Sequence, residues 1–476
     1  MTTTADQAAT PTTVSATQPS GADVVQKLRA TFATGRTRSL EWRRAQLDGL
    51  ARMFAERESE IIAAVQSDLG RSEYEAWFGD VGSCESEIAH TRKHLKKWMK
   101  PERAPVPAAL RPARAQVVPE PLGAVLIISP WNYPVYLAIA PLAAALAAGN
   151  TVAVKPSEVS PASSAVMARL LPEYLDADAV AVIEGGVAET TDLLEQRWDH
   201  ILYTGGPNVG RIVAAAAAKY LTPVTLELGG KTPTIVHKDA NLKQAARRVA
   251  FAKFCNAGQT CIATDYVYVH KDVEDEFADL LTAEVKERYG DDPKTSPDFG
   301  RIINENHAAR LAQFLEGGFD RAQFGGTADV DSKYIAPTLL RGIQPDAKVM
   351  QEEIFGPILP LLTYDSLDEP INAINAGEKP LALYVFSKSD AVTKRVLSET
   401  SSGGACVNEV MMHIMVSDMP FGGVGESGYG AYHGKTGFDT FSHGKSVLRR
   451  PSWLPELPAA RAPYAPWKLK LMKKML

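Results

Sequence analysis

The chain has 476 residues, of which 45% are hydrophobic and 22% are charged, a composition typical of a soluble protein with two or three domains. Its 51 basic and 56 acidic residues give a formal net charge of −5 without long runs of one sign, which argues against nucleic acid as the main partner. Four scattered cysteines without a CxxC pair argue against a disulfide framework and indicate a reducing, cytoplasmic location.

The N-terminal part begins with a polar segment and continues with helical patterns. Residues 1–22 are rich in Thr, Ala, Ser and Pro, and the first 20 contain neither a basic residue nor an apolar core. This composition predicts a disordered tail rather than a secretory signal. Apolar residues then recur at helical spacing through residues 23–100. The Pro-rich, basic stretch that follows predicts an extended arm over residues 101–118.

Beyond the arm, short β-type runs alternate with helical segments. The runs GAVLIIS, NTVAVK, AVAVIEG, HILYTG and TPVTLEL lie between residues 123 and 228. This alternation predicts a parallel sheet covered by helices, so we assign residues 23–100 and 119–228 to one α/β domain. The same rhythm resumes after residue 229 and predicts a second α/β domain over residues 229–408. The very apolar residues 133–148 contain two prolines and are short for a membrane span, which favours a buried helix.

Three side chains with catalytic potential stand at predicted sheet edges or turns. Cys261 lies in FCNAGQTC, where a flexible loop could hold a thiol at a domain surface. A single cysteine is more often a small buried hydrophobe, so this residue needs partners. Glu227 lies at the end of a β run that leads directly into two glycines, where a base could be presented, although a solvent-facing glutamate is the simpler alternative. Asn132 follows another strand and could donate its amide to an oxyanion.

A glycine-rich turn follows the fourth β run. Gly205 and Gly210 follow a strand and open a helix, a geometry suited to a pyrophosphate on a helix N-terminus. Arg211 stands where a P-loop requires Lys, which argues against ATP chemistry. The nine histidines form neither HExxH nor a close cluster with cysteine, so we assign no metal.

Seven motifs occur together in the order and spacing of one family. They are SPWNYP, AAGNTVAVKPSE, YTGG, LELGGK, FCNAGQTC, QEEIFGP and MPFGGVGESG. In this joint pattern the chain resembles the aldehyde dehydrogenase superfamily, and PVTLELGGK, KPLALYVFS and YHGKTGFDTFSHGKS resemble its class 3 branch of fatty and aromatic aldehyde dehydrogenases. The resemblance implies a Rossmann-like dinucleotide-binding domain, an α/β catalytic domain, and bridging segments at 101–118 and 409–450 that make a homodimer.

The resemblance also implies a role for each candidate residue. Cys261 is expected to add to the aldehyde, Asn132 and the Cys261 N–H to hold the oxyanion, and Glu227 to activate water against the resulting thioester. The product is then a carboxylic acid. The expected dinucleotide contacts are Lys155, Ser157, Glu158, Gly205, Gly210, Leu228, Gly229, Glu353 and Phe355. The expected borders of the aldehyde channel are Trp131, Tyr133 and Phe421.

Three details modify this expectation. Glu158 would accept a hydrogen bond from an adenosine 2′-hydroxyl and repel a 2′-phosphate, which favours NAD and leaves NADP as an alternative. Gly206 and Pro207 replace a serine-containing turn that many relatives carry, and Pro207 suits the first turn of a helix, so the helix start is expected to persist. The tail, residues 451–476, could form a short basic amphipathic helix on a membrane surface. Packing on a partner subunit or near the substrate entrance is favoured, because so short a helix is marginal alone.

Three rival functions stay open at this point. A cysteine thioesterase or esterase without redox chemistry needs only Cys261 and Glu227, and the cofactor residues argue against it. A CoA-dependent, acylating aldehyde dehydrogenase is a closer rival, which a water-activating Glu227 disfavours. A non-catalytic structural protein is disfavoured because Asn132, Glu227 and Cys261 are all present.

Overall fold

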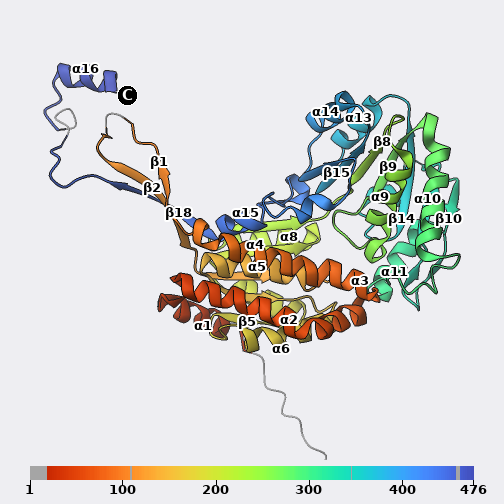
Figure 1. The fold of residues 1–476 in the computed structure, drawn as a ribbon, viewed down its shortest axis with the longest axis horizontal. Coiled ribbons are helices and arrows are strands. Elements are labelled where there is room, and N and C mark those ends of the chain that lie inside the picture. Colours follow the sequence, from red (N-terminus) through yellow and green to blue (C-terminus); the bar gives the residue numbers. More distant parts are fainter. Residues whose placement is uncertain (1–18, 108–109, 345, 457–460, 476) are drawn as a thin grey trace, which may run out of the picture.

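The computed structural model describes residues 19–107, 110–344, 346–456 and 461–475. Most of the predicted N-terminal tail, residues 1–18, lies outside this range. Helix α1 (Gly21–Ala33) starts inside the predicted tail, because the Ser20 side chain accepts a hydrogen bond from the Asp23 N–H and caps the helix. Figure 1 shows two sheet-containing bodies side by side and a thin arm that projects from one of them.

The first body is built on a six-stranded sheet, in which five strands are parallel and one edge strand is antiparallel. The spatial order is β17 (Gly428–Tyr429), β7 (Val224–Leu228), β6 (His200–Gly205), β3 (Ala124–Ile128), β4 (Thr151–Lys155) and β5 (Val180–Val182). The central strands are apolar and buried on both faces, as a sheet covered by helices on both sides requires. The predicted α/β class and parallel sheet are confirmed.

Helices from two parts of the chain cover this sheet. Those that follow its strands are α5 (Tyr136–Ala148), α6 (Pro161–Tyr174), α7 (Val187–Glu195) and α8 (Pro207–Ala218). The N-terminal helices α2 (Leu40–Leu69) and α4 (Ser83–Trp98) pack on α5; α2 lies in the lowest layer in Figure 1, and α4 lies above it. Every residue of α5 is buried, so the apolar stretch is an internal helix. Among the described residues, no helix is both long and apolar enough to cross a membrane.

The second body contains a seven-stranded sheet, parallel except for the edge strand β10. The spatial order is β10 (Arg321–Phe324), β13 (Thr338–Arg341), β14 (Ile358–Tyr364), β9 (Tyr266–His270), β8 (Pro233–Val236), β15 (Ala382–Phe386) and β16 (Gly404–Val407). Its helices include α9 (Leu242–Phe254), α10 (Glu274–Tyr289), α11 (Glu305–Ala312), α13 (Asp368–Ala376) and α14 (Asp390–Glu399). The chain crosses between the two bodies directly after β7.

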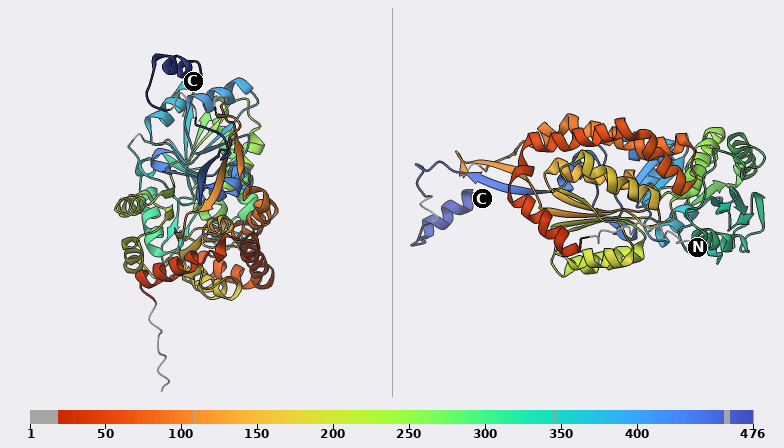
Figure 2. Two further views of the ribbon diagram at one scale, coloured as in Figure 1. Left: turned by 90° about the vertical axis from the view of Figure 1, so that its left-hand side faces the viewer. Right: turned by 90° about the horizontal axis from the view of Figure 1, so that it is seen from below.

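The arm is a three-stranded antiparallel sheet made from segments far apart in the sequence. Its strands are β1 (Glu102–Ala104), β2 (Arg114–Pro121) and β18 (Ser442–Arg449), with β2 in the middle. The tail helix α16 (Pro466–Met475) lies at the far end of this arm (Figures 1 and 2). Residues 409–450, which were predicted as a bridging segment, contribute to the first body as well as to the arm, because β17 pairs with β7 and extends the first sheet.

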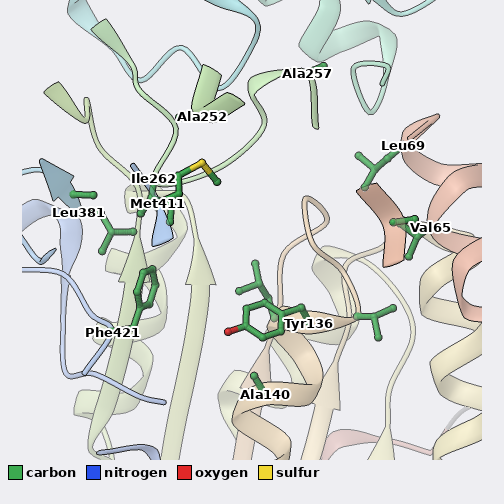
Figure 3. Packing of buried hydrophobic residues seen from close by; sticks show 14 of the residues in the cluster. Val65, Leu69, Tyr136, Ala140, Ala252, Ala257, Ile262, Leu381, Met411 and Phe421 are labelled. Atoms are coloured by element: carbon green, nitrogen blue, oxygen red, sulfur yellow. The ribbon is translucent and has the colours of Figure 1, made fainter. Parts of the chain in front are cut away.

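One apolar core continues across the boundary between the two bodies. It contains Tyr136 and Ala140 of α5 together with Ile262, Leu381 and Phe421 from beyond the crossing point. Figure 3 shows Tyr136 with its hydroxyl directed toward the side of the cluster on which Phe421 lies. Burial of this shared surface holds the two bodies in one relative position, which a site formed by residues of both requires.

Candidate active site

A cavity of about 920 Å³ lies where the two bodies meet. Residues from the ends of β3, β6 and β7 line one side, and residues around the start of β9 and the loop after α12 (Lys348–Gln351) line the other. Ten of the candidate residues face it: Trp131, Asn132, Gly205, Glu227, Leu228, Gly229, Cys261, Glu353, Phe355 and Phe421. The carboxyl ends of the parallel strands β3, β6 and β7 supply six of them, as is usual for open α/β sheets, and loops of the other segments supply Cys261, Glu353, Phe355 and Phe421.

Cys261 is presented by a tightly fixed turn. Asn256 and Ala257 both have left-handed backbone conformations, with φ values of 51° and 49°. The fully buried Gln259 side chain holds this turn, since it donates to the Asn256 carbonyl and accepts from the Ile303 N–H. Burial, together with the charges of Glu353 and Glu227, raises the pKa of the Cys261 thiol to about 12. The thiol is therefore protonated at neutral pH in this state of the protein.

Glu227 does not face solvent at a sheet edge. Its strand β7 is flanked by β6 on one side and by β17 on the other, where Gly428 is its pairing partner. The side chain is buried, and neither carboxylate oxygen has a hydrogen-bond partner among the described residues. Burial raises the pKa of Glu227 well above its usual range. An unpaired carboxyl in a cavity wall is costly for stability, which is typical of a group kept for chemistry.

Asn132 joins the turn after β3 to the turn that carries Cys261. Its side-chain amide donates to the Gln259 carbonyl over 3.0 Å, and its own carbonyl accepts from the Asn256 side chain over 2.9 Å. The carboxamide NH₂ has two N–H groups, so one remains for a ligand in the cavity. Asn132 and the backbone of Cys261 are thereby fixed relative to each other.

The loop that carries Glu353 and Phe355 is held against the same cavity. Arg310 donates to the Ile354 carbonyl over 2.6 Å, and the Ile354 N–H donates to Asp265 over 2.9 Å. Lys231 bridges this loop to Asp265, at 2.5 Å from its carboxylate. Burial and the neighbouring charge of Asp265 raise the pKa of Glu353 to about 8.

These anchoring residues were not singled out from the sequence, although Lys231 and Gln259 stand inside quoted motifs. Arg310 and Asp265 lie outside those motifs, and no local pattern marks them. Arg310 and Asp265 bond to backbone groups of residues 353 and 354, and Asp265 also bonds to the Lys231 side chain; all these partners are distant in the chain, so pattern reasoning could not identify them.

Five expected site residues do not line the cavity: Tyr133, Lys155, Ser157, Glu158 and Gly210. Lys155, Ser157 and Glu158 lie at and beyond the carboxyl end of β4, where the buried Lys155 ammonium contacts the Glu158 carboxylate at 2.8 Å. The Tyr133 hydroxyl bonds to Thr260 over 2.8 Å, and its ring lies below the Arg71 guanidinium. Tyr133 thus supports the turn from behind rather than bordering the channel.

Gly210 has a packing position inside α8. A Cβ at this residue would lie 2.9 Å from a methyl group of Leu228, so glycine lets the helix approach β7 closely. Gly210 does not line the cavity, and its expected contact with a phosphate stays a prediction. The helix itself begins at Pro207, as expected, with the start of α8 at the cavity wall.

The cavity wall suits a polar ligand of dinucleotide size. The Thr204 hydroxyl and the Glu227 carboxylate are buried there without partners among the described residues. A Cβ at Gly229 would lie 2.2 Å from a Glu353 oxygen, so the wall is closely fitted at this point. The volume is within the range of cofactor sites. In the described part of the chain, no group of three or more His, Cys, Asp or Glu side chains is arranged to hold a metal ion.

Comparisons with known proteins agree with this geometry. The aldehyde dehydrogenase family model matches residues 3–447. Aldehyde dehydrogenase family 3 member A2 of Rattus norvegicus is 50% identical over 433 residues, covering 89% of this chain and 87% of the relative. Family 3 member B1 of Homo sapiens is 47% identical over 451 residues, covering 94% and 96%. The dimeric NADP-preferring aldehyde dehydrogenase of Canis lupus familiaris is 47% identical over 429 residues, covering 90% and 94%.

Solved structures show the same architecture. The substrate-bound Staphylococcus aureus AldH superimposes with a TM-score of 0.93 at 44% identity, covering 95% of this chain and 98% of that one. An indole-3-acetaldehyde dehydrogenase in complex with NAD⁺ gives a TM-score of 0.82 at 26% identity, covering 91% and 90%. The chain therefore belongs to the aldehyde dehydrogenase family and is an enzyme that oxidises an aldehyde to a carboxylic acid with a nicotinamide dinucleotide.

Proposed function

We propose that the enzyme acts on long-chain aliphatic or aromatic aldehydes, with NAD as the preferred dinucleotide. The observation that carries the catalytic part is that Cys261, Glu227 and Asn132 meet in one cavity with Glu353. The substrate class is supported by apolar side chains that line the same cavity as Cys261 and include Trp131, Leu137, Phe421 and Tyr432. Such a wall favours an apolar substituent on the aldehyde carbon.

The residues divide the reaction between them. The Cys261 thiol gives up its proton to solvent, its sulfur bonds to the aldehyde carbon, and the oxyanion that forms accepts hydrogen bonds from the Asn132 amide and the Cys261 N–H. The chemistry that a bound dinucleotide supplies is acceptance of hydride. Cys261 then carries the acyl group as a thioester, and Glu227 takes a proton from the water that attacks it. The acid leaves, and the proton that Glu227 took from water restores the Cys261 thiol.

The raised pKa values restrict when this cycle starts. Burial raises the pKa of the Cys261 thiol to about 12 and raises the pKa of Glu227 well above its usual range, so burial favours the protonated form of both groups. Glu227 acts as a base only after it has lost its own proton, so we propose that its ionisation follows ligand binding. Turnover is then expected to rise with pH, because a larger fraction of Glu227 is ionised at higher pH.

The dinucleotide preference is supported by the Lys155–Glu158 pair. Lys155 donates to Glu158 over 2.8 Å, and this contact lowers the pKa of Glu158 even though partial burial opposes the shift. A permanent carboxylate at this position accepts from a 2′-hydroxyl and repels a 2′-phosphate. Because the Glu158 carboxylate offsets the charge of the Lys155 ammonium, Lys155 offers little net attraction to that phosphate.

A panel of aldehydes, measured with NAD and NADP in parallel, tests both proposals. We expect kcat/KM to be highest for long-chain or aromatic aldehydes, and higher with NAD than with NADP. Glu158→Gln is expected to raise kcat/KM with NADP relative to NAD by about tenfold. The substitution removes a repulsion between the Glu158 carboxylate and the 2′-phosphate that we take as roughly 1.4 kcal/mol. Highest activity with short aldehydes would refute the substrate class, and a preference for NADP in the unchanged enzyme would refute the cofactor assignment.

We also propose that the enzyme is a cytoplasmic homodimer joined through its arm. The arm extends away from the body, and its edge strand β18 has no neighbour on its outer side among the described residues. Such edges are ready to pair with another chain. Unpaired thiols at all four cysteines favour a reducing compartment. A mass of one chain by analytical ultracentrifugation would refute the dimer.

The tail helix α16 at the tip of the arm is proposed to contact the partner subunit. Trp467 and Leu469 are exposed, and Lys470, Lys473 and Lys474 are exposed as well, so the helix is unpartnered in a single chain. The same residues would suit a membrane surface with anionic lipids. Co-sedimentation with phosphatidylserine vesicles distinguishes the two: binding that disappears on deletion of residues 461–476 would refute the subunit contact.

A further inference from the structure

A buried ion pair lies directly behind the Asn132 turn, on the side away from the cavity. Arg71 follows the end of α2, and Asp80 lies in the one-turn segment Trp77–Gly82 between α3 (Glu73–Ala76) and α4. Both side chains are fully buried, and the guanidinium contacts the carboxylate at 2.7 Å. Burying a charge pair in a protein interior is costly, and the pair is seldom the most stable solution at its position.

Asp80 fixes the end of the turn. While one carboxylate oxygen faces Arg71, the other accepts hydrogen bonds from the Val135 N–H over 2.9 Å and from the Tyr136 N–H over 3.0 Å. These are N–H groups at the start of α5, which have no partner within the helix. Asp80 therefore acts as an N-terminal cap from a distant part of the sequence and sets the point at which α5 begins.

Arg71 fixes the beginning of the same turn. Its guanidinium donates to the Asn132 carbonyl over 3.4 Å and lies over the Tyr133 ring at 4.8 Å. Gly79 allows this close packing, since a Cβ there would lie 2.7 Å from the Tyr133 ring. Together, Arg71 and Asp80 hold the backbone from residue 132 to residue 136.

The same segment also reaches the turn that carries Cys261. Glu75 of α3 accepts from the Asn256 N–H over 3.1 Å, and the Asn256 side chain donates to the Asn132 carbonyl over 2.9 Å. Contacts from residues 71–80 thus hold the two turns that carry the proposed oxyanion donors, the Asn132 amide and the Cys261 N–H. The relative position of two donors matters because a displacement of about 1 Å can cost roughly 100-fold in rate.

We propose that Arg71 and Asp80 are positioning residues for the oxyanion site and act through the orientation of Asn132. The inference rests on the proposed role of Asn132 as an oxyanion donor. It assigns a kinetic function to a buried pair that does not line the cavity. The expected signature is a loss of kcat that depends on Asn132, without a loss of dinucleotide binding.

A double-mutant cycle between Arg71→Lys and Asn132→Ala tests the inference in the full-length enzyme. Arg71→Lys keeps the charge but removes the planar guanidinium, whose Nη2 atom contacts both Asp80 and the Asn132 carbonyl and whose face covers the Tyr133 ring. We expect it to lower kcat by about tenfold and Asn132→Ala to lower kcat by about 100-fold. In the Asn132→Ala background, Arg71→Lys should lower kcat by less than about twofold, because the donor that it orients is absent.

Two further measurements separate positioning from general damage. The dissociation constant of NAD and the rate of Cys261 alkylation by iodoacetamide should change by less than about twofold in Arg71→Lys, since neither depends on an oxyanion. Arg395→Lys, at an exposed ion pair with Asp368 on the far body, is the matched control and should leave kcat unchanged. Asp80→Glu keeps both charges and repeats the cycle if Arg71→Lys does not fold.

The outcomes are distinct for the inference and for the function on which it rests. Equal slowing by Arg71→Lys in both backgrounds would overturn the inference while leaving Asn132 in its role. An unchanged kcat in Asn132→Ala would remove the oxyanion donor and the inference together. The inference is supported if the effects of Arg71→Lys and Asn132→Ala on kcat are non-additive while NAD binding and Cys261 alkylation are preserved.

Discussion

The substitution Gly229→Ala tests how closely the cavity wall is fitted around Glu353. A Cβ at this position would lie 2.2 Å from one Glu353 carboxylate oxygen and 2.4 Å from the other. Because Cβ atoms essentially never approach heavy atoms below 3.0 Å, the carboxylate has to move by about 0.8 Å or more. The loop cannot follow freely, since Arg310 and Asp265 hold its backbone at Ile354.

The size of the effect follows from the hydrogen bonds that Glu353 is expected to make to the dinucleotide ribose. A hydrogen bond to a charged group contributes about 1.5–3 kcal/mol, which corresponds to roughly 10- to 150-fold in affinity. We expect Gly229→Ala to raise the KM for NAD by about 10- to 100-fold and to lower kcat, because the nicotinamide end is displaced. Steady-state formation of NADH and direct titration of NAD by fluorescence measure the two effects.

The control and the refutation use the same assays. Gly377→Ala is the matched control, because a Cβ there would make ordinary contacts at 3.7 Å and the backbone is extended. In a Glu353→Ala background, Gly229→Ala should change the KM by less than about threefold, since the displaced carboxylate is gone. A folded Gly229→Ala enzyme whose KM for NAD stays within about twofold of the unchanged enzyme would refute this account of the cavity wall.

Four further predictions concern individual side chains. Cys261→Ala should abolish aldehyde oxidation and leave NAD binding intact, and substantial residual turnover would exclude Cys261 from the mechanism. Glu227→Gln should slow steady turnover by about 100-fold while a fast first formation of NADH persists, whereas equal loss of both phases would assign Glu227 to thiol activation. NAD affinity should rise with pH through about 8, where Glu353 ionises, and this rise should be absent in Glu353→Gln. Gly210→Ala should lower the free energy of unfolding by about 1–3 kcal/mol, because its Cβ overpacks against Leu228; an unchanged denaturation midpoint would contradict this.

The strands were predictable because their physical requirements are local. Runs such as GAVLIIS and NTVAVK are apolar on both faces, which only a strand covered on both sides can bury, and both appear as β3 and β4. The start of α8 was predictable for a similar reason, since Pro207 has a backbone conformation suited to the first helical turn. The short strand β17 was not predictable, because Gly428 and Tyr429 join the sheet through pairing partners 201 and 203 residues away.

The sequence alone determined which groups are available for chemistry: a thiol at Cys261, a carboxyl at Glu227 and an amide at Asn132, each placed by its motif at a strand end or turn. Only the tertiary structure decided the pKa values and the orientations of these groups. Burial without a hydrogen-bond partner raises the pKa of Glu227, and that environment is built from β6, β7 and β17 together. The support of Asn132 by Arg71 and Asp80 is likewise invisible in sequence, because it joins backbone groups and charges from separate segments, and local patterns carry no information about such long-range contacts.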